Sequence, residues 1–393
     1  MFVKSRLMTP GPTQVAESTR LVMATAHPHH RSEEFSGRFT SMLKKLAWLW
    51  DTDGEVVFVT GSGTAGMEAS LRTCLRASDR IVAVGGGKFA ERWVEICRDI
   101  SPGTAELEVR HGASATAAGL DAVLDAQPSW DALVLVASET STGALHPVAE
   151  LVAAFRRRCP GGLVIVDGIT AVGCVDLSMR RDGIDVLVSG TQKSFGVPPG
   201  GAMVGFAPKV QDWMDRPGST VNLSLDLRGE RKQFSGGDSA FTPSVPLVLA
   251  LDEVMTRWMA FGREALFEHQ RALSAGTIAG VRACGLELFA PSPSPALTSI
   301  AVPDGVAAAR VIDTMRSRYG ITVTGGQDAM KGRVIRIGHL GAVDAVDVIA
   351  SVTALELALI DQGRPLQPGA AAAAAVAAMA GAMQRSPIRQ YNP

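Results

Sequence analysis

The stretch LVSGTQKSFGVPPGGAMVGF, residues 187–206, joins two apolar runs through a turn rich in glycine and proline. Lys193 is the only charged residue between Asp185 and Lys209. A strand that ends at such a turn would place this amine in a partly desolvated setting, where the neutral form becomes accessible. The residue types alone leave open Schiff-base chemistry, phosphate binding and an ordinary surface lysine.

Short runs rich in Val, Ile and Leu recur before this stretch and alternate with helical patterns. Examples are EVVFVT, RIVAVG, DALVLVAS and GLVIVDG, several of them separated by amphipathic segments such as PVAELVAAFRRR. Apolar strands alternating with helices are typical of a mostly parallel sheet covered on both faces. The pattern therefore predicts a large α/β domain over residues 20–262, preceded by an irregular N-terminal arm at 1–19.

The remainder of the chain has a different pattern. Residues 263–361 contain a long helical segment, then short apolar strands and two further helices, which predicts a smaller C-terminal α+β domain. Residues 362–393 are rich in alanine and show no clear apolar face. We expect this tail to be weakly ordered.

Composition excludes several classes of protein. Net charge is −1, with 46% apolar and 20% charged residues, so no nucleic acid or anionic membrane is expected as a partner. No apolar run is long enough for a signal peptide or a membrane span. The five cysteines contain no CxxC pair and are expected to be reduced, which favours a cytoplasmic location. The histidines of HPHHRSEEF, residues 27–35, lack the spacing of a metal site, so no metal is expected.

The motif VTGSGTAGMEA, residues 59–69, predicts a strand that delivers a glycine turn to the start of a helix. Backbone N–H groups and the helix dipole make such a turn an anion site. The motif also fits the loose dinucleotide pattern Gly-x-Gly-x-x-Gly, but no acidic residue ends the following strand. A nucleotide-binding module without enzymatic activity therefore stands as a weaker alternative, beside a plain tight turn.

Two further residues occupy positions typical of ligand sites. Asp167 ends the apolar run LVIVD, at the edge where α/β sheets bind their ligands, although a helix cap or a magnesium ligand would also suit it. Arg336 stands between two isoleucines in VIRIGHLG. Its planar guanidinium fits a carboxylate, and a rim salt bridge is the alternative.

In order and spacing, these motifs resemble the class V aminotransferases, which are fold-type-I pyridoxal 5'-phosphate (PLP) enzymes. The nearest likeness is to the alanine–glyoxylate and serine–glyoxylate branch. It covers residues 7–361 and is carried by TPGPT, HRSEEF, TGSGTAGMEA, ETSTGALHP, VDGITAVG, SGTQKSFGVPPG, FTPSVPL and RIGHLG.

The resemblance implies a role for each motif. Lys193 would hold PLP as an internal aldimine and move the proton in a ping-pong reaction, while Asp167 would pair with the pyridinium nitrogen. Arg336 would bind the substrate carboxylate. A homodimer is implied, in which Thr242 and Ser244 reach the neighbouring subunit's cofactor phosphate. The other cofactor contacts would be Ser62, Gly63, Thr64, Phe89, Thr140, Ile169 and Gln192.

The resemblance leaves the reaction partly open. It favours transfer from an alanine- or serine-like donor to glyoxylate or pyruvate. Lyases and cysteine desulfurases of the same fold carry His before the lysine and a loop cysteine, whereas Gln192 precedes Lys193 and residues 320–340 contain no Cys. An aminophosphonate donor stays open, with Arg31 and Arg228 as extra anion contacts or, more simply, surface charges. Phe241 replaces a tyrosine common in relatives and cannot donate its hydrogen bond.

Overall fold

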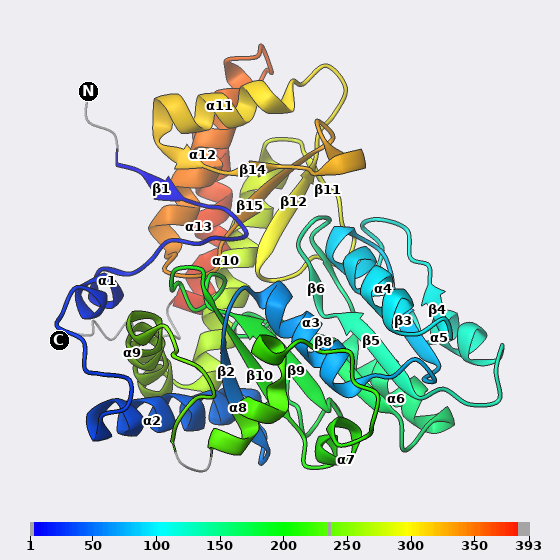
Figure 1. The fold of residues 1–393 in the computed structure, drawn as a ribbon. Coiled ribbons are helices and arrows are strands. Elements are labelled where there is room, and N and C mark those ends of the chain that lie inside the picture. The colour runs from blue at the N-terminus through cyan, green and yellow to red at the C-terminus, as the bar shows by residue number, and fades with distance from the viewer. Residues whose placement is uncertain (1–3, 235–236, 384–393) are drawn as a thin grey trace.

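The large α/β part of the molecule is built on one seven-stranded sheet. The computed structural model describes residues 4–234 and 237–383 (Figure 1). The strand order is β2-β10-β9-β8-β5-β3-β4, parallel throughout except that β10 runs antiparallel to both neighbours. The predicted mostly parallel sheet is therefore confirmed. The strands are β2 (Glu55–Thr60), β3 (Ile81–Val84), β4 (Thr104–Leu107), β5 (Ala132–Val136), β8 (Leu163–Asp167), β9 (Val186–Gly190) and β10 (Gly201–Phe206).

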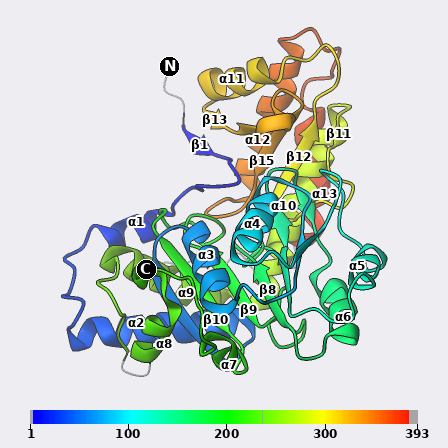
Figure 2. The same cartoon turned by 45° about the vertical axis from the view of Figure 1, so that its right-hand side comes forward.

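Side chains of successive strand residues pack into two different apolar cores, one on each face of the sheet. In β8, Val164 and Val166 join one apolar cluster, whereas Leu163 and Ile165 join the other. This period of two places Asp167 on the second face. The first face is covered by α2 (Glu33–Trp50), α5 (Ala117–Leu124), α6 (Val148–Arg158) and α9 (Val245–Phe261), and the second by α3 (Gly63–Cys74), α4 (Lys88–Ile100) and α7 (Val210–Met214) (Figure 2).

A second, antiparallel sheet forms the smaller part, in the order β11-β12-β15-β14. Helix α10 (Arg263–Ala283) leads into it from the large part (Figure 1). Its other elements are β11 (Glu287–Leu288), β12 (Leu297–Ala301), α11 (Ala308–Tyr319), β13 (Ile321–Thr322), β14 (Thr324–Gly325), the 3-10 turn η2 (Asp328–Met330), β15 (Val334–Gly338) and α12 (Ala345–Ile360).

The N-terminal arm is more regular than the sequence suggests. Strand β1 (Arg6–Leu7) pairs in parallel with β13, and helix α1 (Glu17–Met23) packs on α9. The Gly338 N–H also donates to the Met8 carbonyl, at 2.8 Å. Because of these contacts the arm crosses from the small part to the large one and brings Pro10 and Gly11 over the turn that carries Lys193.

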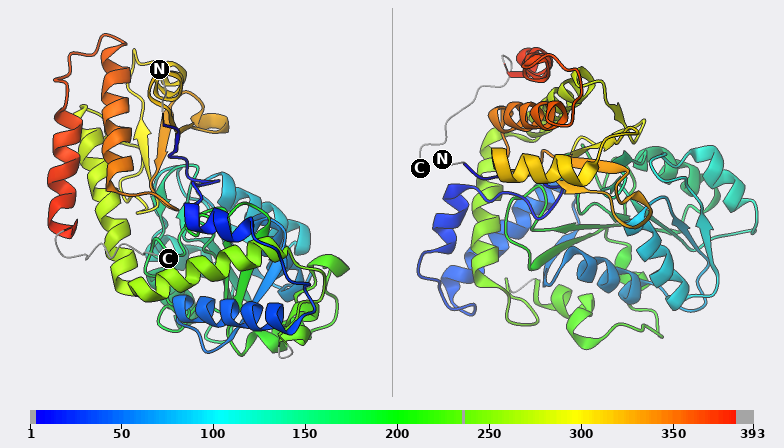
Figure 3. Two further views of the ribbon diagram at one scale, coloured as in Figure 1. Left: turned by 90° about the vertical axis from the view of Figure 1, so that its left-hand side faces the viewer. Right: turned by 90° about the horizontal axis from the view of Figure 1, so that it is seen from above.

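The alanine-rich tail is ordered where the structure describes it. Helix α13 (Ala370–Met383) packs on α10 and α12 (Figure 3). Its residues Ala371, Ala375 and Met379 are fully buried. A β-carbon on Gly276 of α10 would stand 2.6 Å from Met379, so small side chains let the helices approach closely. The expectation of weak order is thus wrong for residues 370–383, because one buried row of apolar side chains, packed on α10 and α12, suffices. Residues 384–393 lie outside the described part.

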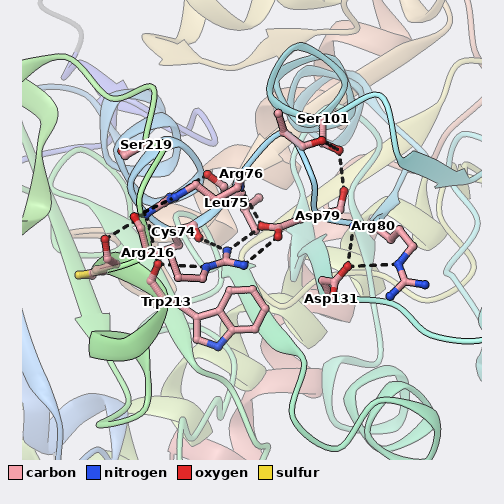
Figure 4. Close-up of polar contacts among 12 residues, drawn as sticks. Cys74, Leu75, Arg76, Asp79, Arg80, Ser101, Asp131, Trp213, Arg216 and Ser219 are labelled. Atoms are coloured by element: carbon pink, nitrogen blue, oxygen red, sulfur yellow. Dashed lines mark hydrogen bonds and ion pairs between the residues drawn. The ribbon is translucent and has the colours of Figure 1, made fainter.

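A buried arginine fastens the end of α3 to the segment after α7. Arg76 donates to six backbone carbonyls, those of Thr73, Leu75, Trp213, Met214, Arg216 and Pro217. Figure 4 shows Arg76 among Leu75, Trp213 and Arg216. Arg216 completes the cluster through an ion pair of 2.7 Å with Asp79.

No helix among the described residues is both long and apolar enough to cross a membrane. The remaining elements are β6 (Ser138–Glu139), β7 (Ala144–Leu145), η1 (Leu223–Leu225) and α8 (Leu227–Phe234).

Candidate active site

Lys193 stands in the turn after β9, half-buried beneath the N-terminal arm. Its Nζ donates to the Pro10 carbonyl at 2.8 Å and lies 6.0 Å from the centre of the Phe89 ring. Burial lowers the pKa of Lys193 to about 8, and the negative charge of Asp167 opposes that shift. A lysine in this state is a usable nucleophile near neutral pH.

Asp167 lies buried at the carboxyl end of β8, the strand beside β9. Its Oδ1 accepts from the Ile169 N–H and its Oδ2 from the Trp93 indole, both at 2.8 Å. Burial raises the pKa of Asp167 to about 6, while these two hydrogen bonds oppose the rise. Because β8 and β9 are neighbours in the sheet, the carboxylate of Asp167 and the amine of Lys193, both with shifted pKa values, lie at the same edge.

The start of α3 forms the third part of the site. The Ser62 side chain caps this helix by accepting from the Ala65 N–H at 3.2 Å. Gly63 lies against Ile169, whose Cδ1 would stand 2.8 Å from a β-carbon at Gly63. The Thr64 hydroxyl accepts from Arg92 Nη1 at 3.0 Å. This helix end thus presents backbone N–H groups, two hydroxyls and a cation at one point.

Two residues of α4 that the sequence analysis missed belong to this site. The Arg92 guanidinium lies 5.3 Å from the centre of the Phe89 ring and forms no ion pair among the described residues. Trp93 is the indole donor to Asp167. With Phe89 they stand at i, i+3 and i+4 on α4, the spacing of one helical face. The segment KFAERW contains that signal, and only the phenylalanine in it was recognised.

Glu139 is a third residue that was missed, and it holds the start of α4 in place. This fully buried carboxylate accepts from the Phe89 and Ala90 N–H groups, at 3.2 and 3.0 Å. It also accepts from the Ser141 N–H and hydroxyl. A carboxylate at a helix N-terminus complements the helix dipole. Its place in ETSTG was visible in the sequence.

Arg336 reaches the same edge from strand β15 of the smaller part. Its Nε and Nη2 donate to the Gly325 carbonyl, at 3.0 and 2.7 Å, and Nη1 donates to the Thr140 carbonyl at 2.8 Å. A guanidinium has five N–H donors, so two keep no acceptor among these contacts. The side chain is buried, and backbone carbonyls, not a carboxylate of the protein, hold its guanidinium in place.

Some of the remaining predicted residues lie close to Lys193, whereas others lie at the surface. Gln192 precedes Lys193, and its buried Oε1 has no hydrogen-bond partner within the described residues. Thr242 is exposed, and Ser244 precedes α9 as its N-cap residue, without a side-chain cap bond. Neither of these two bonds to the Lys193 group within the described part of one chain. Arg31 pairs with Asp238, and Arg228 pairs with Asp226, as surface charges do.

Comparison with known proteins identifies the family. The model of the class-V aminotransferases matches residues 13–343. The small subunit of a soluble hydrogenase from Synechococcus sp. (strain PCC 6716) is 38% identical, covering 95% of this chain and 97% of that protein. The L-aspartate–glyoxylate aminotransferase of Paracoccus denitrificans is 29% identical, covering 95% and 96%.

A solved structure agrees in fold. The aspartate aminotransferase of subgroup IV from Thermus thermophilus superposes with a TM-score of 0.85 at 30% identity, covering 91% of this chain and 99% of that one. The family match extends from the arm above Lys193 to the segment that follows Arg336. The chain belongs to the class-V aminotransferase family, and the edge of the sheet described above is its candidate active site.

Proposed function

We propose that this aminotransferase uses PLP to move an amino group from a small amino acid, of the alanine or serine type, to a 2-oxo acid such as glyoxylate or pyruvate. One observation carries the proposal. The amine of Lys193 and the carboxylate of Asp167 end up at the same edge of the sheet, and burial shifts both of their pKa values toward neutrality. Such paired shifts are expected where groups act on protons.

The residues around this pair suit the chemical groups of PLP. The phosphate is a dianion, and the start of α3 offers it backbone N–H groups, the Ser62 and Thr64 hydroxyls and the Arg92 cation. Gln192 would also suit an anion. Its buried Oε1 has no hydrogen-bond partner within the described residues, and rotating the amide would present N–H donors instead. Phe89 and Ile169 supply apolar surface for a flat ring.

Each residue then has a defined task. When bound, PLP supplies an aldehyde for the amino group and a ring that accepts negative charge from the substrate carbon. Asp167 would offer its buried carboxylate to the protonated ring nitrogen of the cofactor. Lys193 would hold the cofactor through its Nζ and would carry a proton between substrate atoms. The arm above Lys193 covers part of the side chain and accepts a hydrogen bond from its Nζ.

Arg336 would bind the substrate carboxylate. Its two N–H groups without acceptors can form a bidentate contact, and the backbone carbonyls that hold the other three fix the fork in advance. Because the carbonyls of Thr140 and Gly325 carry no formal charge, the guanidinium keeps its full positive charge for the substrate.

A homodimer that works in the cytoplasm completes the proposal. Large apolar side chains are exposed on α1, on η1, on the segment between α8 and α9, and on α9 itself: Leu21, Leu223, Phe241 and Met259. A second copy covering them would bury apolar surface and let Thr242 and Ser244 reach the partner's phosphate site. All five cysteines are free and buried, as suits a reducing compartment.

The test joins cofactor chemistry to a substrate panel. Borohydride treatment of the purified protein should fix PLP covalently on the Lys193 peptide, detected by mass spectrometry. Alanine, serine, aspartate and 2-aminoethylphosphonate would each be offered with glyoxylate and with pyruvate, and the oxo product measured. Protein that takes up no PLP would contradict the proposal.

The desulfurase alternative is an outcome of the same test. A desulfurase needs a cysteine that can reach the substrate, whereas the five cysteines here are buried and burial raises the pKa of four of them. Sulfide or alanine formed from cysteine, with no oxo acid from any donor, would establish the lyase instead.

A further inference from the structure

The Trp93 indole approaches Asp167 from within the core. The Nε1–Oδ2 distance is 2.8 Å, and the two residues are only 2% and 4% exposed. Trp93 comes from α4, while Asp167 ends β8 on the face that α4 covers. An indole N–H can only donate, so it stabilises the ionised carboxylate over the protonated one.

Few other groups share the control of this carboxylate. Within the described residues Asp167 has one other hydrogen-bond donor, the Ile169 backbone N–H on Oδ1. The charged groups that act on it are Glu139, which raises its pKa, and Lys193, which lowers it. Trp93 is therefore the one side chain, among those that the structure describes, that holds Oδ2 by a hydrogen bond, and substitution can remove it without touching the backbone.

We propose that Trp93 is a positioning residue, whose indole N–H keeps Asp167 ionised and turned so that its free lone pairs face a protonated ring nitrogen. This inference rests on the proposed PLP function. The same helical face carries Phe89 toward Lys193 and Arg92 toward Thr64. A single face of α4 thus contacts the regions assigned to the ring, the ring nitrogen and the phosphate.

The functional test compares Trp93→Phe with Trp130→Phe. Trp130 is a matched control, because it is buried and its indole donates to the Leu124 carbonyl at 3.1 Å, outside the site. A hydrogen bond to a charged group is strong enough that its loss should raise the Asp167 pKa by about one unit. The acid limb of kcat should move up by about one pH unit, and the Kd for PLP should rise about tenfold, with KM for the amino donor unchanged.

A second measurement needs no cofactor. The chain has six tryptophans, so the apoprotein labelled with ¹⁵N-tryptophan should show few indole signals, and the Trp93 signal is the one that Trp93→Phe removes. We expect this signal to shift with pH with a midpoint near 6, following the pKa of about 6 at Asp167, and to lose that dependence in Asp167→Asn.

The outcomes are separable. An indole signal indifferent to pH and to Asp167→Asn would overturn the inference, as would a Trp93→Phe enzyme with the acid limb and PLP affinity of the wild type. If the protein binds no PLP, the proposed function fails on the panel described above. The apoprotein spectrum still decides whether Trp93 controls the carboxylate.

Discussion

Gly11 lies so close to Lys193 that a β-carbon on Gly11 would stand 2.6 Å from the lysine Nζ. The φ angle of Gly11 is +131°, a conformation that L side chains rarely adopt. The neighbouring Pro10 carbonyl accepts the hydrogen bond from the same Nζ. The arm therefore positions the amine. Position 11 requires glycine both for its backbone conformation and for the space that Lys193 occupies.

Gly11→Ala should accordingly displace Lys193 and reduce the PLP content of the purified protein severalfold. The matched control is Gly37→Ala, because a β-carbon at Gly37 of α2 would meet nothing within 4 Å. PLP content would be measured by absorbance after alkaline release, and folding by thermal melts. Full PLP content in Gly11→Ala, with an unchanged melting temperature, would show that the arm does not control the amine.

The pKa of Lys193 predicts how PLP uptake depends on pH. Only the neutral amine attacks an aldehyde, and the pKa is lowered from 10.5 to about 8. The rate at which the apoprotein takes up PLP, measured by stopped-flow absorbance, should rise about tenfold per pH unit below 8 and level off above it.

Asp167 supplies an internal check on that curve. Its negative charge raises the pKa of Lys193, so Asp167→Asn should move the midpoint to a pH below that of the wild type. A rate that climbs without a break toward pH 10 would mean that burial does not tune this amine.

Much of the fold was predictable from sequence because the strands are apolar on both faces. Runs such as LVIVD are fully buried in the structure, and runs of that kind indicate a covered parallel sheet directly. The ends of these strands placed Asp167 and Lys193 correctly at one edge. Arg336 was proposed as a carboxylate contact because it stands between two isoleucines, and that role stays a prediction.

The missed residues share a different property, since their roles depend on packing between elements. From the sequence alone, Trp93 is an ordinary apolar helix residue. Its role becomes visible only when α4 packs on the face of the sheet where Asp167 ends β8. Arg92 reads as a surface charge until Thr64 stands beside it. The alanine tail was misjudged for the same reason, because its buried row is defined by Gly276 on another helix.

Arg336→Ala should raise KM for donor and acceptor acids alike, by about 10- to 100-fold, because two charge-assisted hydrogen bonds to the carboxylate are lost. The same contact exists in ground and transition states, so kcat should change far less. In Arg336→Lys, KM should rise less than in Arg336→Ala, because lysine keeps the positive charge but cannot form the two parallel hydrogen bonds of a guanidinium.

Arg333→Ala is the matched control for that series, because Arg333 is exposed and lies just before the same strand. Steady-state kinetics with alanine and with pyruvate would measure the split between KM and kcat. An unchanged KM in Arg336→Ala would move the carboxylate contact to another residue.

Arg76 gives a prediction about stability that is separate from the chemistry. Arg76→Met keeps the apolar stem but leaves six backbone carbonyls without their donor, in a place that is only 5% exposed. The free energy of unfolding should fall by about 3 kcal/mol, while PLP content and kcat stay near wild type. Arg158→Met removes an exposed ion pair with Asp125 and should cost less than about 1 kcal/mol. Urea denaturation at one fixed protein concentration measures both, and equal midpoints would show that the cluster around Arg76 does not hold α3 to the segment after α7.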